Sequence, residues 1–387
     1  MIEVHVNRKA ADRVASGHPW IFSSDVTERA GAEPGSVVEV VDPKRRKLGI
    51  AQYSAASQIC LRMLSGRTEP VDARFYEKRL AAALEFRSAV VCDSDAYRLV
   101  HAEADLLPAL IVDRYGDYLS VQTLNQGMDR AKDWIVAGLL RLLKPKGIVL
   151  RNDAPVRKKE ELPLEVTVAH GEVPPEVAVR MNGFQFHADL LHGQKTGTFL
   201  DQRENYLAAA KYARGKALDC FTSSGGFAMH LAGKCESVEA VDSSAEAIRV
   251  AGRNADTNGI ANIEFREANA FDLLAGYASA RREFSMVVLD PPAFAKSRDS
   301  LEGAARGYKD INLRALRLLP PGGVLVTCSC SHHVSEGMLL EIVAAASLDA
   351  GRKLRVLERR TQSQDHPILL TVPETHYLKC LILQVLL

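Results

Sequence analysis

The chain has 387 residues, 47% hydrophobic and 25% charged, a globular composition that excludes disordered and fibrous proteins and predicts two or three domains. No apolar stretch approaches the roughly 18 residues that a membrane span needs, and the charged amino end predicts no secretory signal. A formal net charge of +1 excludes a protein that is basic throughout, so any nucleic-acid site must be local.

The first segment, residues 1–68, has short β-type runs separated by turns, and we expect strands at Ser36–Val41, Leu48–Tyr53 and Ile59–Leu64. One hairpin turn carries a basic run that either contacts RNA phosphate or is simply solvated: Lys44, Arg45, Arg46 and Lys47. Trp20, within Gly17–Phe22, is either a core residue or a contact for RNA bases. Gly17–Phe22 followed by a small β-rich module resembles the PUA domain, a compact RNA-binding barrel found at the head of certain rRNA methyltransferases.

The middle segment, residues 69–176, predicts a small α+β domain. We expect helices at Asp72–Val90 and Met128–Leu143, and strands at Leu107–Asp113, Tyr118–Leu124 and Gly147–Leu150. A second basic cluster, Arg157-Lys158-Lys159, is a further candidate for phosphate contact. The segment shows no reactive group of residues, which favours a role in spacing or RNA contact.

The third segment, residues 177–387, begins with a hairpin signal at Asn182-Gly183 and then alternates strand and helix. The expected strands are Ala217–Phe221, Ser237–Val241, Ile263–Arg266, Ser285–Leu289 and Val324–Thr327, and the expected helices are Gly226–Gly233, Ala245–Asn254 and Gly303–Leu319. This alternation predicts an α/β domain with a parallel sheet, helices on both faces and a ligand at the carboxyl ends of the strands.

A cofactor turn follows the first of these strands, where small residues run from Thr222 to Gly226. Asp242 closes the second strand at a distance suited to a ribose diol. A nicotinamide enzyme would need Gly-x-Gly-x-x-Gly to seat a pyrophosphate, and this spacing is absent. S-adenosylmethionine has no pyrophosphate and tolerates a looser turn. The plain alternative is an ordinary tight turn with a solvated Asp242.

The fourth strand ends in Asp290-Pro291-Pro292, which is similar to motif IV of class I methyltransferases. Proline cannot continue a central strand, so these two residues would hold a loop open beside the ligand. Enzymes that methylate amino groups of adenine or guanine commonly carry an aromatic residue next. Ala293 stands there instead, which counts against that class.

The fifth strand runs into Thr327-Cys328-Ser329-Cys330-Ser331, which resembles motif VI of RNA 5-methylcytosine methyltransferases. Carbon 5 of cytosine is too weak a nucleophile to take a methyl group from a sulfonium, but a thiolate adding to carbon 6 converts the ring into an enamine. We predict Cys330 as this nucleophile because it lies further out along the strand than Cys328. Asp290 would stabilise the adduct at the N3 and amino edge of the ring.

Further residues resemble the PUA-bearing bacterial large-subunit rRNA (cytosine-5)-methyltransferases, namely Gly193–Arg203, Tyr308, Asn312, Asp365-His366-Pro367, Pro373-Glu374 and Tyr377-Leu378-Lys379. The resemblance implies a PUA domain, a small middle domain and a class I methyltransferase domain, acting in the cytoplasm. It implies S-adenosylmethionine as donor and a cytosine of large-subunit (23S) rRNA as acceptor, with no membrane partner and with a homodimer left open. The cofactor contacts expected on this basis are Lys195, Thr196, Phe199, Asp201, Arg203, Asp219, Phe221, Thr222, Ser223, Gly225, Asp242, Ser243, Asn269, Ala270, Asp290 and Pro291.

The chain departs from this pattern in two places. Many RNA 5-methylcytosine enzymes carry a second cysteine where Ala293 stands, so the base that removes the carbon-5 proton is unassigned. Relatives tend to have an acidic adenine contact where Asn269 and Ala270 stand, although an amide oxygen can also accept from the adenine amino group. Seven cysteines without paired metal-ligand spacing predict no metal. The alternatives are an rRNA guanine methyltransferase and a non-catalytic RNA-binding assembly factor.

Overall fold

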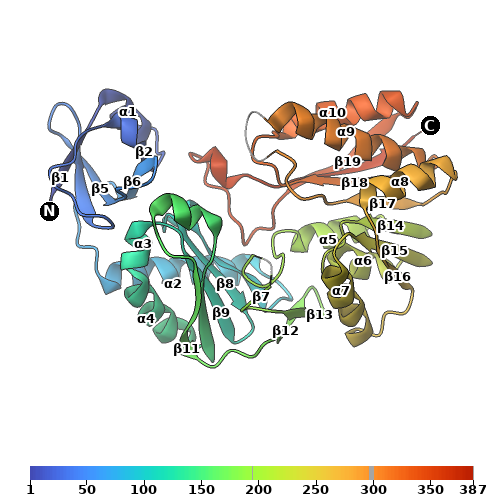
Figure 1. The fold of residues 1–387 in the computed structure, drawn as a ribbon, viewed down its shortest axis with the longest axis horizontal. Coiled ribbons are helices and arrows are strands. Elements are labelled where there is room, and N and C mark those ends of the chain that lie inside the picture. Colours follow the sequence, from blue (N-terminus) through green and yellow to red (C-terminus); the bar gives the residue numbers. More distant parts are fainter. Residues whose placement is uncertain (194, 296–299, 387) are drawn as a thin grey trace. The chain divides into compact units, whose positions relative to one another are not determined.

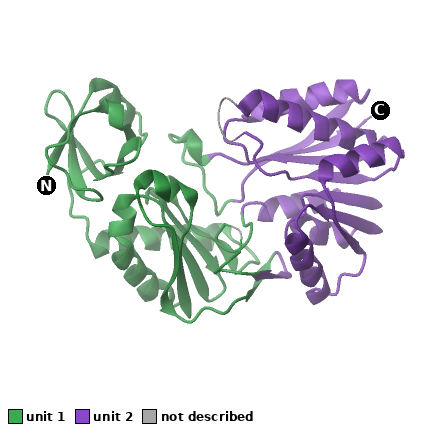
Figure 2. Cartoon of the chain, in the orientation of Figure 1, with its two compact units in different colours: residues 1–181, 188–200, 364–375 green, residues 182–187, 201–363, 376–387 purple. Residues whose placement is uncertain are grey.

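The computed structural model describes residues 1–193, 195–295 and 300–386. The chain divides into two compact units, coloured separately in Figure 2. Unit 1 contains Met1–Met181, Ala188–Leu200 and Gln364–Thr375, and unit 2 contains Asn182–His187, Asp201–Ser363 and His376–Leu387. None of the helices in the described ranges combines the length and the apolarity that a membrane span requires.

The amino-terminal part of unit 1 is a six-stranded sheet with the order β2-β6-β5-β4-β1-β3 (Figure 1). Its strands are β1 (Glu3–Val6), β2 (Trp20–Phe22), β3 (Val26–Glu28), β4 (Val37–Val41), β5 (Lys47–Tyr53) and β6 (Ile59–Ser65), and α1 (Arg8–Ala15) follows β1. The predicted β-rich module and its last three strands are confirmed. The sequence did not reveal β1, β2 and β3, because three or four residues are too few to show an alternating pattern.

The middle of unit 1 is a five-stranded sheet with the order β11-β10-β9-β8-β7. It contains β7 (Ala96–His101), β8 (Leu110–Tyr115), β9 (Tyr118–Thr123), β10 (Gly147–Asn152) and β11 (Glu165–Gly171), with the helices α2 (Ala73–Val90), α3 (Gln126–Arg130) and α4 (Lys132–Leu143). The single helix predicted over Met128–Leu143 is wrong at its start. Asn125 accepts a hydrogen bond from Met128 N, so a short helix begins at Gln126 and precedes α4.

Unit 2 is built on a seven-stranded sheet with the order β16-β15-β14-β17-β18-β20-β19. The strands are β14 (Lys216–Cys220), β15 (Ser237–Asp242), β16 (Ile263–Glu267), β17 (Met286–Leu289), β18 (Val324–Ser329), β19 (Leu354–Thr361) and β20 (Lys379–Val385). The first five are parallel, as predicted. The expectation of a sheet that is parallel throughout is wrong, because β20 runs antiparallel to both β18 and β19.

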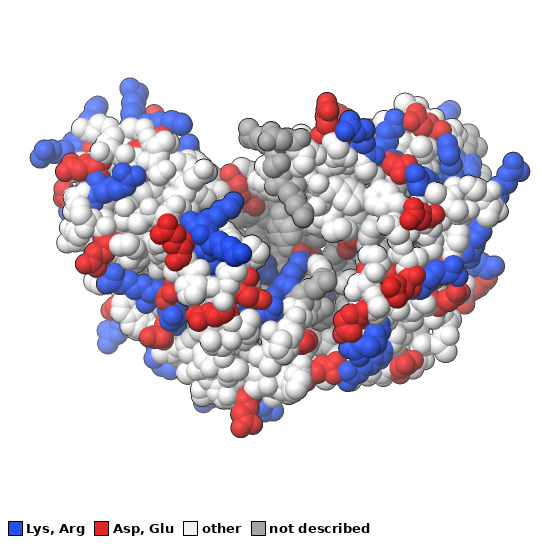
Figure 3. All heavy atoms as spheres, in the orientation of Figure 1, with Lys and Arg blue, Asp and Glu red and all other residues white. Residues whose placement is uncertain are grey.

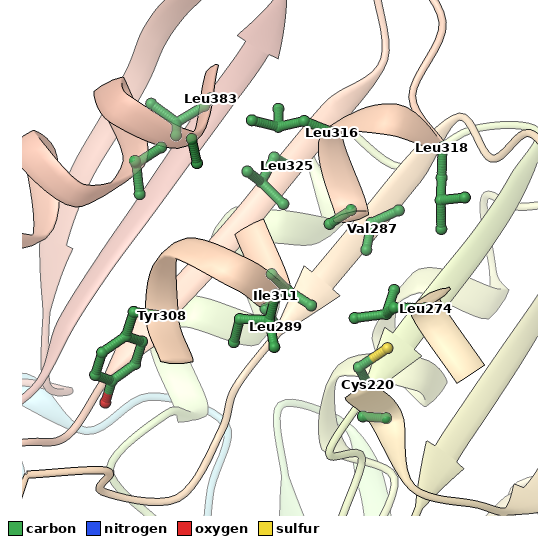
Figure 4. Close-up of a cluster of buried hydrophobic side chains, with 14 of the residues drawn as sticks. Cys220, Leu274, Val287, Leu289, Tyr308, Ile311, Leu316, Leu318, Leu325 and Leu383 are labelled. Atoms are coloured by element: carbon green, nitrogen blue, oxygen red, sulfur yellow. The ribbon is translucent and has the colours of Figure 1, made fainter. Parts of the chain in front are cut away.

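Helices cover both faces of this sheet, as predicted (Figure 1). They are α5 (Arg203–Ala210), α6 (Gly226–Ala232), α7 (Ala245–Thr257), α8 (Ala270–Ser279), α9 (Leu301–Arg317) and α10 (Glu336–Asp349). One buried cluster joins the sheet to α8, α9 and α10, and Figure 4 shows part of it around Leu289 and Ile311. A second cluster on the opposite face includes Tyr206 of α5 and Phe227 of α6. Two cores therefore fix both faces of the sheet.

The strand order reverses between β14 and β17, which are neighbours although two strands separate them in sequence. Open α/β sheets bind ligands outside the carboxyl ends of their strands at such a point. Before this sheet, the chain turns at Asn182-Gly183 between β12 (Val177–Met181) and β13 (Phe184–Ala188), and both turn residues have positive φ, as predicted for a tight hairpin turn.

Candidate active site

The loop after β14 has an unusual backbone. Phe221, Ser223 and Gly225 have φ values of 66°, 50° and 85°, in the left-handed region that non-glycine residues rarely adopt. Gly226 opens α6 so close to α5 that a Cβ at this position would overlap the ring of Tyr206. The loop is therefore held in a defined shape at the amino end of a helix, where backbone N–H groups can face a ligand.

Asp219 lies fully buried beneath this loop. Its Oδ2 accepts hydrogen bonds from Thr222 Oγ1 at 2.6 Å and from Ala228 N at 3.0 Å. Its Oδ1 is buried without a hydrogen-bond partner among the described residues. Burial raises the pKa of Asp219 to about 7, and the negative charges of Asp290 and Asp242 add to this effect. A buried acceptor without a donor is costly, so the loop fits a ligand that donates a hydrogen bond here.

Asp242 ends β15 next to the loop and is half-buried. Its Oδ2 accepts from Ser223 N and its Oδ1 from Ser244 N, each at 3.0 Å. Each carboxylate oxygen keeps a further lone pair, so Asp242 can still accept from the two hydroxyls of a ribose. Ser243, the next predicted contact, is exposed.

Asn269 and Ala270 lie where β16 leads into α8. Asn269 is exposed, and its Oδ1 accepts from Phe271 N at 2.8 Å and thereby caps the helix. Ala270 is buried at the first helical position. The amide oxygen proposed for adenine recognition thus already accepts one hydrogen bond and has one lone pair left for the adenine amino group.

Asp290 follows β17 directly. Because Leu289 is paired with Cys220 in parallel register, Asp290 and Phe221 leave the same edge of the sheet from neighbouring strands. Gln202 Nε2 donates to Asp290 Oδ1 at 2.9 Å, and Gln202 is itself held by Asn205 at 2.6 Å. Sequence reasoning did not single out Gln202, although it lies within the recognised run Gly193–Arg203.

Cys330 stands just beyond the end of β18 and is half-buried. Its Sγ lies 3.9 Å from the carbonyl oxygen of Pro291, in the loop that follows Asp290. The hydroxyls of the buried neighbours Ser329 and Ser331 lie 2.9 Å and 3.0 Å from Tyr308 OH. Both sides of the cysteine are therefore anchored to α9, while its sulfur faces the Asp290-Pro291 loop.

Cys328 has a different environment. It lies within β18, fully buried and directly opposite Cys380 of β20, in the second hydrophobic cluster. Burial holds the pKa of the Cys328 thiol well above its ordinary value. A buried thiol with a raised pKa is a poor nucleophile, which favours Cys330 for the chemistry.

Lys379 is a site residue that sequence reasoning missed, although it belongs to the recognised run Tyr377-Leu378-Lys379. It opens β20 and is 2% exposed. Its ammonium donates to the carbonyl oxygens of Ser331 at 2.7 Å and Tyr377 at 2.9 Å. Lys379 is therefore a buried charged residue that is hydrogen-bonded to the neighbour of Cys330, and its burial requires a physical explanation.

The structure divides the predicted contacts from Lys195 to Arg203, the first residue of α5, between the two units. Lys195, Thr196 and Phe199 belong to unit 1, whereas Asp201 and Arg203 belong to unit 2. Thr196 is buried, with its hydroxyl 2.5 Å from Asp113 Oδ2 and 3.0 Å from Tyr115 OH. In unit 2, Tyr377 OH donates to Asp201 Oδ2 at 2.8 Å.

Two of the four charges predicted to bind RNA in the β4–β5 turn are neutralised within the protein. Arg46 pairs with Asp42 at 2.7 Å and Lys47 with Glu39 at 2.8 Å. Lys44 and Arg45 are exposed and form no ion pair within the described residues. Figure 3 likewise shows Lys and Arg interspersed with Asp and Glu over the visible face. The effective basic cluster is therefore smaller than the sequence suggests.

The other RNA candidates are also engaged internally. Trp20 is half-buried and donates from Nε1 to Glu103 at 2.8 Å. Arg157 is fully buried and pairs with Asp129 at 3.0 Å. The prediction of a phosphate contact is therefore wrong for Arg157, whose charge holds the structure together, while Lys158 and Lys159 remain exposed. Within the described ranges, no cluster of His, Cys, Asp and Glu could hold a metal ion.

Comparison with known families divides the chain in a similar way. Residues 4–66 match the PUA-like domain family, and residues 167–382 match the family of S-adenosylmethionine-dependent methyltransferases. The chain is 39% identical to the ribosomal RNA large subunit methyltransferase I of Tolumonas auensis, with 98% of each chain covered. It is 42% identical to the enzyme of the same name from Aeromonas hydrophila, with 95% of each covered.

Solved structures share the fold. An S-adenosylmethionine-dependent methyltransferase structure from Streptococcus mutans superposes with a TM-score of 0.85 over 100% of both chains, at 19% identity. A methyltransferase complexed with SAH gives the same values. The likeness supports the three-part architecture, in which an amino-terminal PUA domain and a middle domain precede a class I methyltransferase domain.

Proposed function

Since the chain belongs to the ribosomal RNA large subunit methyltransferase I family, we propose that it methylates carbon 5 of a cytosine in large-subunit rRNA through a covalent adduct with Cys330. The protein is an S-adenosylmethionine-dependent methyltransferase with a PUA domain. The position of the methyl group and the covalent step are our proposal. The single observation that carries it is the half-buried Cys330 beside the Asp290-Pro291 loop.

The residues around the β14 loop suit S-adenosylmethionine, which supplies an activated methyl group when bound. Asp242 offers carboxylate oxygens to the ribose hydroxyls. The unpartnered Asp219 Oδ1 suits a donor such as an ammonium group, which would also favour the ionised carboxylate. Phe221 to Gly225 shape the backbone between these two carboxylates.

Cys330 would act first. Its thiolate forms a bond to carbon 6 of the flipped-out cytosine, and the electron pair of the 5,6 double bond moves onto the ring toward N3. Carbon 5 then attacks the sulfonium-bound methyl group, and the S–CH3 bond breaks with its electron pair returning to sulfur, so that S-adenosylhomocysteine is the leaving group. Loss of the carbon-5 proton to a base restores the double bond and expels the Cys330 thiolate.

Asp290 would stabilise the ring during this sequence. Its carboxyl group can hydrogen bond to the N3 and amino edge, where charge develops after the thiolate adds. Gln202 donates to Asp290 Oδ1 from the protein side and so fixes the orientation of the carboxyl group. This arrangement favours a cytosine over a guanine, since methylation of a guanine nitrogen needs no thiol next to the carboxylate.

RNA that contains 5-fluorocytosine tests the proposal, because carbon 5 then carries fluorine in place of the proton that a base must remove, and the adduct is trapped. We expect a denaturation-resistant complex with the parent protein and with Cys328→Ala. Cys330→Ala should form none while still binding S-adenosylhomocysteine. An adduct that persists in Cys330→Ala would reverse the assignment. Turnover that neither substitution affects would favour the guanine-methylating alternative.

We further propose that the segments 1–68, 69–176 and 177–387 act as separate domains, with RNA contacts in the first. Lys44, Arg45 and Trp20 are the candidates that remain. A hydrogen bond from Nε1 to Glu103 fixes one edge of the Trp20 ring, and the guanidinium carbon of Arg62 lies 5.5 Å from the centroid of this ring. This geometry supports stacking of a base on the Trp20 ring, as in other single-strand RNA sites.

A further inference from the structure

Lys379 lies at the junction of β18 and β20. It is paired with Ser329 in the antiparallel register, and its Nζ donates to the carbonyl oxygen of Ser331, two residues further along. The second hydrogen bond, to Tyr377 O, fixes the ammonium from the β20 side. Cys330 lies between Ser329, the last residue of β18, and Ser331, so the ammonium is held against the backbone that carries the sulfur.

This buried ammonium has no carboxylate partner in the part of the chain that the structure describes. Within the described residues, Lys379 makes two hydrogen bonds to neutral carbonyls and no ion pair. Buried lysines are rare unless paired, because removing an ammonium from water is costly. Burial accordingly lowers the pKa of Lys379 to about 8, and negative charge on Cys330 opposes that shift. A thiolate at Cys330 would supply the negative charge that the Lys379 ammonium otherwise lacks.

We propose that Lys379 is a positioning residue that keeps the Cys330 sulfur ionised and ready to attack. When Cys330 ionises, its S–H bond breaks, the proton leaves to solvent and the electron pair stays on sulfur, where the positive charge of the nearby Lys379 ammonium, which keeps its own proton, stabilises it. An ion pair in a low-dielectric site is far stronger than in water. The proposal rests on the proposed function of Cys330 as nucleophile.

Other groups near Cys330 are less suited to this role. Asp290, after β17, carries negative charge and opposes ionisation of a neighbouring thiol. Tyr308, on α9, is neutral because burial raises the pKa of its hydroxyl. His332 is exposed and His333 half-exposed, so water screens any charge that they carry. Lys379 is the buried cation among these described neighbours.

The test measures the ionisation of Cys330 directly, without RNA or donor. Iodoacetamide labelling of the Cys330 peptide is followed by mass spectrometry from about pH 5.5 to 10 in the parent, in Lys379→Met and in Lys216→Met. Lys216 is an exposed lysine at the start of β14 and serves as the matched control. Labelling of the buried Cys328 in the same samples reports whether each variant is folded.

We expect the parent Cys330 to label with a midpoint at least one pH unit below the ordinary thiol value of about 8.5. Lys379→Met should raise this midpoint by at least one unit, which slows labelling about tenfold at pH 7, and Lys379→Arg should restore part of the shift. Lys216→Met should match the parent. An unchanged midpoint in Lys379→Met would overturn the proposal and leave Lys379 a structural residue.

The parent protein keeps the proposal falsifiable if Lys379→Met does not fold. A parent midpoint at or above about 8.5 would then overturn it. The outcome is separate from that of the proposed function. A low midpoint without a 5-fluorocytosine adduct would support the Lys379–Cys330 pair and contradict cytosine chemistry, whereas an adduct with an ordinary midpoint would do the reverse.

Discussion

Asp219 and Asp242 end neighbouring strands, yet they differ in solvation. Asp242 is half-buried and takes two backbone N–H groups, whereas Asp219 is fully buried with one oxygen unpartnered. The two residues look equivalent in sequence, since each is the acidic residue near the end of an apolar strand. Their difference arises from the loop that closes over Asp219, and this closure depends on three-dimensional packing.

We predict that Asp219→Asn changes the pH dependence of stability. The folded pKa is raised to about 7, so folded parent binds more protons than the unfolded chain between about pH 4 and 7 and loses stability as the pH rises through this window. The asparagine does not titrate. Thermal unfolding should therefore show the variant gaining up to about 4 kcal/mol relative to the parent between pH 4 and 8, because the pKa is raised by about three units at about 1.4 kcal/mol each.

Binding of S-adenosylhomocysteine provides the control for this substitution. An asparagine oxygen can keep the Thr222 and Ala228 hydrogen bonds, but the variant lacks the negative charge that suits an ammonium donor. S-adenosylhomocysteine should therefore bind Asp219→Asn more weakly. Parallel pH curves for variant and parent would mean that Asp219 ionises as an ordinary carboxyl group.

The candidate site shows what the sequence could reveal residue by residue. Asp242, Asp290 and Cys330 were identified because each follows an apolar strand, and the structure places all three at the carboxyl edge of one sheet. Gln202 and Lys379 were not singled out, because their roles depend on hydrogen bonds to residues 88 and 48 positions away. Pattern reasoning detects local periodicity and does not detect such long-range partners.

At the scale of elements, two of the longer strands that escaped prediction have an unusual environment. The strand β11 is exposed along nearly its whole length, so it lacks an apolar face. The strand β20 is buried except for one residue, and its apolar run from Cys380 to Leu383 is too short for periodicity to distinguish a strand from a buried helix. The expectation of a wholly parallel sheet failed for this reason, since β19 and β20 were not anticipated.

The hydroxyl cluster that joins α9 to β18 leads to a second prediction. Tyr308 OH lies near Ser329 and Ser331, and Ser331 Oγ also accepts from Ala295 N at 3.2 Å. Tyr308→Phe leaves these buried hydroxyls short of a partner, which costs about 1–3 kcal/mol. We expect a lower thermal stability and slower 5-fluorocytosine adduct formation, with unchanged binding of S-adenosylhomocysteine.

The matched control is Tyr212→Phe, which removes a hydroxyl that donates to Glu358 at 3.0 Å on another part of unit 2. That variant should lose some stability without slowing the adduct. Equal adduct rates in parent and Tyr308→Phe would show that the cluster does not help to position Cys330.

At the scale of the whole molecule, nearly balanced charge limits where RNA can bind. The net charge is +1, and many basic side chains already pair with carboxylates. Such pairs release few counter-ions on binding and contribute little to salt-dependent affinity. Unpaired basic residues should therefore dominate the electrostatic part of RNA binding.

We predict that two double variants of adjacent residues differ in the salt dependence of their RNA affinity. These variants are Lys44→Ala/Arg45→Ala and Arg46→Ala/Lys47→Ala. The first pair should flatten the slope of log K against log salt by about 0.7–0.9 per lost phosphate contact. The second pair removes charges that Asp42 and Glu39 already neutralise, so the slope should change less. Equal slopes in the parent and the Lys44/Arg45 variant would mean that this turn is only solvated.

The return of residues 364–375 to unit 1 has a consequence for biosynthesis. Asp365 accepts a hydrogen bond from Arg98 N on its carboxylate, and its carbonyl accepts from the fully buried Arg87. A ribosome releases the chain from its amino end, so Arg87 and Arg98 emerge more than 260 residues before this partner. Unit 1 cannot complete its folding until residues 364–375 have left the ribosome, and until then its middle sheet should resemble an intermediate that chaperones can bind.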